Sequence, residues 1–260
     1  MKQLPVQIII CSLLIILSLL FSQSLLAQEE ILARNPAISP DGSQISFSYQ
    51  GDIWVAPYEG GVGIRLTLHE SYESNPVFTR DGKHLVFSGN RYGNNDLFKV
   101  DIAGTQIERL TYHSASNVNP GIQSDGTIFF NTRRAYATVE REWEIFRLDP
   151  GIKTPYRAMD ALGFSPTPTE NGRLIAFEKG TAPTNREPYT GPAVRNIFTY
   201  HTDREQYHQI TDGEAMHVNP KWVGNTLFYL SSESGTYNLY SQEIGNNGQK
   251  RGDARQITSF

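Results

Sequence analysis

Serine, histidine and aspartate residues are abundant in this sequence, but their spacing offers no catalytic triad. The G-x-S-x-G elbow that exposes the nucleophile of α/β-hydrolases occurs nowhere in the 260 residues. Most Ser, His and Asp residues instead recur at equivalent positions of an internal repeat, where turns are expected. A constellation chosen freely from such residues carries no chemical argument. We therefore assign no catalytic residue and expect no catalysis within this chain.

His69 and His113 share one repeat position, two residues after a threonine. They could form a metal pair, or each could brace a loop. Because no H-E-x-x-H motif or matching carboxylate spacing accompanies them, we predict that they brace turns. The same role is predicted for His84, His201, His208 and His217. The one cysteine, Cys11, lies in the N-terminal apolar run, so we expect no metal site, no thiol chemistry and no cofactor.

Five polar residues share another repeat position, directly before an apolar and aromatic segment. They are Asp52, Asp96, Glu144, Asn196 and Asn238. A ring of acidic groups around a channel could bind cations. A polar residue at the start of a strand also hydrogen-bonds adjacent turn backbone, and we favour this structural role. Asp41, Asp81 and Asp125 are assigned to turns by the same reasoning.

Two segments depart from the repeat, and irregular loops on a rigid scaffold are where binding residues concentrate. Residues 131–141 contain a basic cluster, and residues 181–196 are rich in Pro and Gly. Arginine binds peptide carboxylates in a bidentate manner, and mixtures of Arg and aromatic residues are enriched at protein interfaces. We predict peptide or interdomain contact by Arg133, Arg134, Tyr136, Arg141, Arg186, Tyr189 and Arg195. The alternative is that these loops are simply solvated.

An internal repeat predicts the elements that must position these residues. Each copy has an Asn-Pro or Ser-Pro pair, an Asp-Gly-like turn and several short apolar runs. The copies lie near residues 35–67, 75–111, 119–159, 165–211 and 219–258. A repeat of this length with four short strands is typical of a propeller blade, and Asp-Gly between apolar runs indicates a hairpin. We predict an all-β, β-propeller fold of four-stranded blades over residues 28–260, with five repeats visible and a sixth missing or incomplete. A β-sandwich, the alternative, does not require a repeated quartet of strands.

Composition and the N-terminus indicate where the protein works. With 23 Lys and Arg against 27 Asp and Glu, the net charge is −4, which argues against general nucleic-acid binding. Residues 1–27 read as a signal peptide, because Lys2 precedes an apolar core and Ala27 offers a small residue for cleavage. We expect an exported, periplasmic protein. The alternative is an uncleaved N-terminal anchor, the only case in which a membrane would be a partner.

The first two repeats carry a family resemblance. The segments SYQGDIWV and NRYGNNDLF, with the later GPAVRNIFTYHTDREQYHQITD, resemble the N-terminal propeller of tricorn-type serine peptidases. The repeats are also similar to the WD40-like repeats of the TolB and tricorn propellers, over about residues 31–260.

This resemblance implies a non-catalytic propeller that channels or sieves peptides in a larger peptidase, whose catalytic part is absent here. Its partners would be peptides and downstream peptidase domains. The N-terminal propeller of tricorn-type peptidases has about the size of six blades, whereas five repeats are visible here. We therefore expect this sequence to be a fragment or a five-bladed variant. Two alternatives remain open. One is a stand-alone TolB-like periplasmic binding propeller, and the other is the propeller of a dipeptidyl-peptidase-like enzyme.

Overall fold

The computed structural model describes residues 32–135, 142–185 and 189–260, which form twenty β-strands and no helix. All strands lie in one compact unit, Ala33–Phe260. Within the described ranges, no helix is long and apolar enough to cross a membrane. The N-terminal segment interpreted as a signal peptide, residues 1–27, lies outside the described residues.

The strands form five antiparallel sheets, each built from four consecutive strands. Blade 1 comprises β1 (Arg34–Ile38), β2 (Gln44–Tyr49), β3 (Asp52–Pro57) and β4 (Ile64–Arg65). Blade 2 comprises β5 (Glu73–Phe78), β6 (His84–Gly89), β7 (Asp96–Asp101) and β8 (Ile107–Arg109). Blade 3 comprises β9 (Asn117–Ile122), β10 (Ile128–Thr132), β11 (Glu144–Leu148) and β12 (Tyr156–Leu162). Blade 4 comprises β13 (Phe164–Pro168), β14 (Leu174–Lys179), β15 (Asn196–His201) and β16 (Gln206–Gln209). Blade 5 comprises β17 (His217–Val223), β18 (Thr226–Ser231), β19 (Asn238–Ile244) and β20 (Lys250–Gln256).

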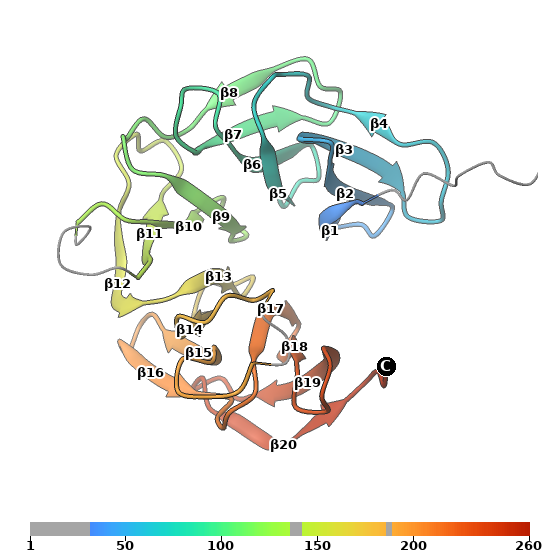
Figure 1. Ribbon diagram of the computed structural model, residues 1–260. Helices are drawn as coiled ribbons and strands as arrows, with labels where there is room; N and C mark the ends of the chain where they lie inside the picture. Colours follow the sequence, from blue (N-terminus) through green and yellow to red (C-terminus); the bar gives the residue numbers. More distant parts are fainter. Residues whose placement is uncertain (1–31, 136–141, 186–188) are drawn as a thin grey trace, which may run out of the picture. The chain divides into compact units, whose positions relative to one another are not determined.

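These sheets confirm the predicted all-β propeller and its five repeats. The first strand of each blade is innermost (Figure 1), and it packs on the first strand of the next blade. A sixth blade is not present among the described residues.

The Asn-Pro pair of each repeat forms a bulge in the innermost strand. The residue before proline has a left-handed backbone, with φ between 50° and 56°, in all five blades: Asn35, Asn75, Asn119, Ser165 and Asn219. The ladder to the second strand shifts register at this pair, as between Ser74 and Val77 in blade 2. Asparagine tolerates this conformation better than most residues, which explains why it recurs in four of the five repeats.

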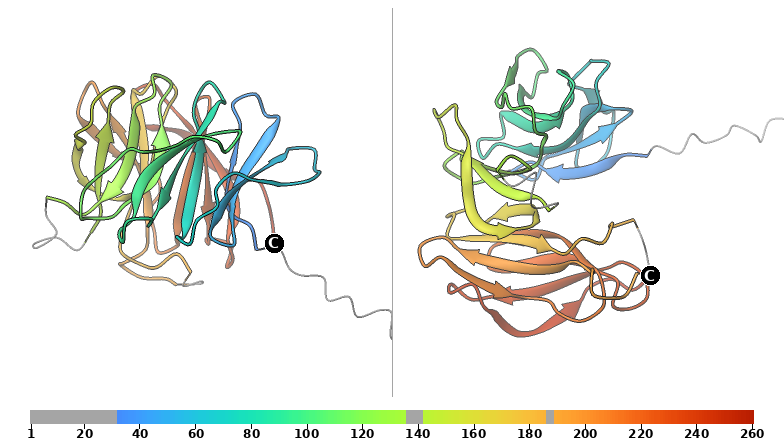
Figure 2. Two further views of the ribbon diagram at one scale, coloured as in Figure 1. Left: turned by 90° about the horizontal axis from the view of Figure 1, so that it is seen from above. Right: turned by 60° about the vertical axis from the view of Figure 1, so that its left-hand side comes forward.

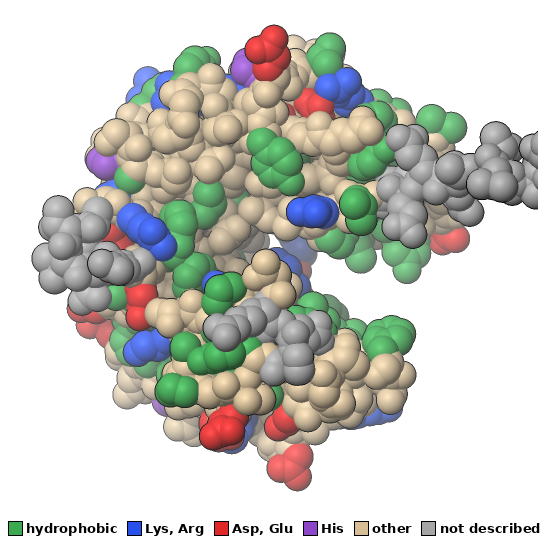
Figure 3. Space-filling view, in the orientation of Figure 1, with side chains coloured by type: hydrophobic (Ala, Val, Ile, Leu, Met, Phe, Trp, Pro, Cys, Tyr) green, Lys and Arg blue, Asp and Glu red, His purple; other side chains and the backbone are tan. Residues whose placement is uncertain are grey.

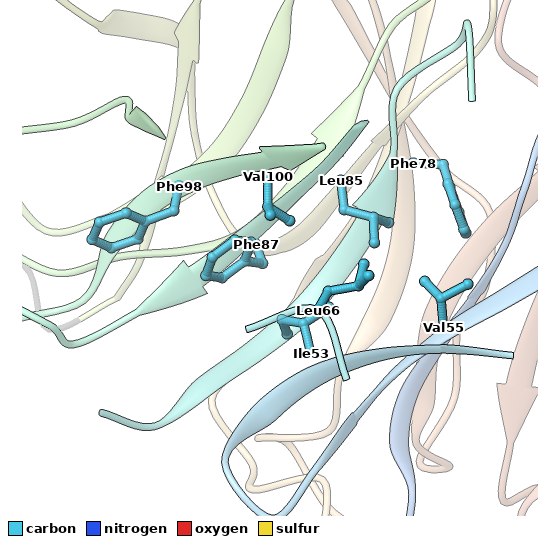
Figure 4. Packing of buried hydrophobic residues seen from close by; sticks show 8 residues of the cluster. All are labelled: Ile53, Val55, Leu66, Phe78, Leu85, Phe87, Phe98 and Val100. Carbon is cyan, nitrogen blue, oxygen red and sulfur yellow. The ribbon is translucent and has the colours of Figure 1, made fainter. Parts of the chain in front are cut away.

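Apolar side chains between neighbouring blades form the core. Between blades 1 and 2 the cluster contains Ile53, Val55, Leu66, Phe78, Leu85, Phe87, Phe98 and Val100 (Figure 4). Blade 1 supplies the first three of these residues, and blade 2 supplies the rest. The continuous apolar run Leu85-Val86-Phe87 is explained by this packing, because Val86 belongs to a second cluster with Phe130 of blade 3. Both faces of a blade are therefore buried.

Antiparallel order decides which loops share an end of the blades. The connection between the second and third strands lies at the same end as the connection to the next blade. We call this the loop end. Residues 133–143 and 180–195 both connect second to third strands, so the two loops predicted to bind partners share it. The described part of the second loop projects from one side of the blades (Figure 2, left).

Candidate functional site

The loop end of blades 3 and 4 holds the described members of the predicted contact set. Arg133 and Arg134 follow β10, whereas Tyr189 and Arg195 precede β15. Tyr136, Arg141 and Arg186 lie outside the described residues. Basic and hydrophobic side chains are interspersed over blades 3 and 4 in the space-filling view (Figure 3).

A stack of two aromatic side chains with an arginine at each end joins the two loops. The Arg133 guanidinium lies 4.5 Å from the centroid of the Trp143 ring, and the Trp143 and Phe164 centroids are 6.4 Å apart. Arg195 completes the stack from blade 4, with its guanidinium 3.9 Å from the Phe164 centroid. Arginine over an aromatic face is an electrostatically favourable contact. Arg133 and Arg195, which are 62 positions apart in the sequence, are thus the two ends of one surface feature built from adjacent blades. We call it the arginine–aromatic stack.

Arg195 is fixed by a buried ion pair. Its Nη1 lies 2.8 Å from Oε2 of Glu178, and its Nε donates to the Ala182 carbonyl at 2.9 Å. Glu178 is 1% exposed and also accepts the Asn219 N–H of blade 5. The Arg195 charge is therefore neutralised inside the protein, and its role is to support the stack and the loop.

Arg134 is likewise held by the blade. Its Nη2 donates to Oδ1 of Asn117 at 2.7 Å, and the guanidinium lies over the rings of Phe130 and Phe146. Burial lowers the pKa of Arg134 from its ordinary value. An equivalent contact occurs in blade 2, where Nη2 of Arg91 lies 2.6 Å from Oε1 of Glu73. Since the contact recurs, Arg134 serves to tie the loop to the innermost strand.

Arg133 differs from its neighbours because it is exposed and forms no ion pair with any described residue. Its backbone is nevertheless anchored, since the N–H groups of Arg134 and Ala135 both donate to Oε2 of Glu144 at 2.8 Å. The ring of Trp143 supports its guanidinium. Arg133 therefore presents a cation in a defined position that no described carboxylate neutralises, which suits recognition of a carboxylate.

Tyr189 packs inward. It lies against a cluster formed by Ala182 and Val194 of its own loop and by Met216 and Val218 of blade 5. The described part of the loop is thereby fixed across two blades. Whether these residues contact a peptide or another domain stays a prediction, because the geometry does not test it.

The polar residue that begins the third strand has a structural role, but in blades 2 and 4 it bonds side chains at or just after the fourth strand and not the turn backbone that we predicted. Oδ1 of Asp96 accepts the Thr111 hydroxyl at 3.0 Å, while Oδ2 lies 2.6 Å from Nη2 of Arg109. In blade 4 the neutral Asn196 accepts the Thr211 hydroxyl at 3.1 Å. Blade 3 has the longer Glu144, which reaches its own loop backbone and anchors Arg133 instead. A repeated scaffold position therefore serves the candidate site in one blade.

Comparison with known proteins assigns the fold to a family. Residues 30–260 match the model of the tricorn protease N-terminal β-propeller domain. The chain belongs to this family. Tricorn protease homolog 1 of Streptomyces coelicolor is 24% identical over 207 residues, which are 78% of this chain and 19% of that protein.

Solved structures agree with this assignment at the level of the fold. A tricorn protease crystal structure superposes with a TM-score of 0.72 and 18% identity, covering 88% of this chain and 22% of that one. A TolB-type protein from Agrobacterium tumefaciens gives a TM-score of 0.69 and 15% identity, covering 87% and 80%. The chain spans about a fifth of the length of the curated tricorn relatives.

Trp143 and Phe164 of this tricorn propeller were missed as site residues by sequence reasoning. Trp143 directly precedes β11, and Phe164 is the first residue of β13. An aromatic residue at the start of a strand is usually interpreted as part of the hydrophobic core. A signal did exist for Trp143, because it flanks the irregular loop that contains Arg133, but Phe164 lies two strands farther along the chain. Only the packing of blade 3 on blade 4 brings the two rings together.

Histidine roles in this tricorn propeller are partly as predicted. His69 and His113 brace turns, since their Nδ1 atoms accept the N–H groups of Ser71 and Ala115 at 3.0 and 2.9 Å. The prediction was wrong for the other four histidines, which lie in strands: His84 in β6, His201 in β15, His208 in β16 and His217 in β17. A single histidine carries no strand signal of its own in the sequence, and only His201 and His217 of these four are buried. The described residues contain no group of three His, Cys, Asp or Glu that could hold a metal ion.

His217 makes stability depend on pH. It is 3% exposed, and burial lowers its pKa below the ordinary value of 6.5, although the nearby Glu233 opposes this shift. In the unfolded chain this imidazole is protonated as the pH falls below about 6.5, whereas in the folded chain it stays neutral to a lower pH. Stability is therefore lost as the pH falls through and below 6.5. We expect His217→Asn, the residue type at the equivalent Asn117, to reduce the loss by up to about 1 kcal/mol per pH unit.

Urea unfolding of both proteins between pH 7.5 and about 5 measures this effect. At pH 7.5, where the imidazole is neutral in both states, the difference between the two proteins gives the cost of the substitution itself. Equal slopes of stability against pH for the two proteins would show that His217 does not carry the dependence.

Proposed function

We propose that the chain is the non-catalytic propeller module of an exported tricorn-like serine peptidase, in which it admits or sieves peptides and scaffolds the catalytic part. The family match over residues 30–260 carries this proposal. It is supported by the relatives themselves, which are named tricorn proteases and extend far beyond the matched region. Export is supported by the signal-like residues 1–27.

Arg133 is the residue through which we propose that peptides are bound. A peptide passing the loop end presents a terminal carboxylate, and a guanidinium can accept it through two parallel hydrogen bonds. Arg134 and Arg195 already pair with protein groups, whereas Arg133 does not pair with a carboxylate of the described residues. The Trp143 ring beside it offers an apolar surface for the last side chain of the peptide.

Peptide binding to the purified chain tests this role. Fluorescence anisotropy with one peptide in two forms, free carboxylate and C-terminal amide, isolates the contribution of the carboxylate. We expect Arg133→Gln to weaken binding of the free acid about tenfold and to leave the amide unchanged.

Arg173→Gln is the matched control, since Arg173 is exposed but lies in the hairpin turn at the other end of blade 4. Binding of acid and amide with equal affinity, or an equal loss in Arg173→Gln, would contradict carboxylate recognition by Arg133.

The mass of the native gene product tests the modular role separately. An antibody against this propeller should detect a band on the order of 100 kDa or more in cell extract, because several further domains are expected. A band near the 29.2 kDa of the chain would refute the peptidase module and favour a free-standing propeller.

We further propose that a sixth blade covers the outer face of blade 1. Ile38 of β1 is 58% exposed, whereas Phe78, at the same repeat position in blade 2, is 8% exposed because blade 1 covers it. At the equivalent position of blades 3 to 5, Ile122, Pro168 and Trp222 are buried or half-buried, so the more exposed Ile38 supports a missing neighbour.

A further inference from the structure

A basic cavity lies at the end of blades 4 and 5 opposite the loop end. It has a volume of about 430 Å³ and is lined by Arg204, Asn246, Asn247, Gln249, Lys250 and Arg251. Arg204 belongs to the turn between β15 and β16, and the other residues belong to the turn between β19 and β20 or to the start of β20. Two neighbouring blades therefore build the cavity.

The three cations that line this cavity have no ion-pair partner among the described residues. None of Arg204, Lys250 and Arg251 forms an ion pair with a described residue. Three acidic residues lie nearby. Asp203 and Glu205 flank Arg204 in the sequence, and Glu243 of β19 lies opposite Arg251 of β20 in the strand register. None of the three lines the cavity. Three cations that form no ion pair with a described residue therefore converge on one cavity, and the acids near them lie outside its lining.

The blade 5 wall of the cavity is held in place. The Thr199 hydroxyl of blade 4 donates to the Gly248 carbonyl at 2.5 Å, and a Cβ on Gly248 would lie 3.1 Å from His208. Within the turn, the Gly245 N–H donates to the Gln249 carbonyl and the Asn247 side chain bonds Gln249. The turn backbone is thus fixed against blade 4, so Lys250 and Arg251 leave it from a defined position.

We propose that this cavity binds a phosphate group. Six polar side chains line it, so it offers no apolar wall for a peptide side chain and favours a compact, strongly hydrated anion. Guanidinium groups bind phosphate oxygens through paired hydrogen bonds, and the carboxamides can donate to the remaining oxygens. The site lies in different turns from Arg133, and it does not depend on peptide binding at the loop end.

Titration of the purified chain with inorganic phosphate at constant ionic strength, followed by NMR, tests this proposal. We expect saturable shifts confined to the turns at residues 202–205 and 245–251. Arg204→Gln and Arg251→Gln should each weaken binding about tenfold. Arg255→Gln, which removes an exposed arginine from the same strand but outside the cavity, should leave the affinity unchanged within about twofold.

A second arm distinguishes the source of the phosphate. Co-sedimentation uses vesicles of phosphatidylcholine with and without phosphatidic acid. Retention only with phosphatidic acid, lost in Arg251→Gln, would identify a lipid headgroup, whereas saturable phosphate binding without retention would identify a soluble phosphate. Shifts that never saturate, or an equal loss of binding in Arg255→Gln, would overturn the proposal. Circular dichroism of each variant verifies that it is folded.

Discussion

Arg195→Met is expected to destabilise the propeller by about 3–5 kcal/mol, the usual cost of leaving a buried charge without its partner. Glu178 is 1% exposed, and Arg195 supplies the cation that neutralises it at 2.8 Å. The substitution also removes the bond to the Ala182 carbonyl and the contact with the Phe164 ring. Guanidinium chloride unfolding at neutral pH measures the free energy, with the midpoint and slope compared between proteins.

The double variant Glu178→Gln, Arg195→Met isolates the charge. A glutamine can still accept the Asn219 N–H but is neutral, so most of the loss should be recovered, to within about 1–2 kcal/mol of wild type. Arg133→Met is the matched control, because it removes an exposed loop arginine without a carboxylate partner and should cost about 1 kcal/mol or less. A double variant as unstable as Arg195→Met alone would show that packing, and not the buried charge, dominates.

Arg109→Gln is expected to cost about 2–3 kcal/mol alone but much less in combination with Asp96→Asn. Asp96 is fully buried, and Arg109 neutralises it at 2.6 Å. The double variant copies the arrangement of blade 4, where Asn196 and Gln209 occupy the equivalent positions. Arg109 Nε and Gln209 Nε2 both donate to the carbonyl of the threonine two residues later, at 2.9 Å, so glutamine preserves this bond.

A double-mutant cycle measured by urea unfolding checks this exchange. The coupling free energy should be about 1–3 kcal/mol in favour of the matched pairs, Asp with Arg and Asn with Gln. The double variant also loses the contact of Arg109 with the Tyr92 and Tyr112 rings, so a residual cost of about 1 kcal/mol is expected. Additive costs, without coupling, would refute the view that the blades use two interchangeable polar pairs.

The propeller could be predicted from the sequence because each copy of the repeat contains its own local signals for turns and strands. Asn75 before Pro76 indicates a bulge, Asp81-Gly82 indicates a hairpin, and Leu85-Val86-Phe87 indicates a strand covered on both faces. All three are local properties, set by the backbone freedom of one residue or by the spacing of side chains. The irregular loops were also visible, because they depart from this pattern.

The sequence did not show which of the candidate arginines have a charged or polar partner in the folded chain. Arg133, Arg134 and Arg195 are the same residue type in the two loops singled out for binding, but their surroundings differ. Arg195 is neutralised by Glu178, Arg134 is held by Asn117, and Arg133 is left exposed on Trp143. Glu178 lies in β14, Asn117 lies in β9 and Trp143 lies in the same loop as Arg133, so no single spacing along the chain predicts the pairing.

By itself, the sequence determined the number of described blades, the place of the turns and the family to which the chain belongs, because these depend on local patterns that repeat about every 40–54 residues. Only the tertiary structure decided which charges are neutralised. Electrostatic pairing depends on distances of a few ångströms between side chains that the strands and loops of one blade bring together, as for Arg195 with Glu178 and Arg109 with Asp96. The position of Arg133 on the Trp143 ring and the cavity at Arg204, Lys250 and Arg251 are likewise visible only in the folded chain.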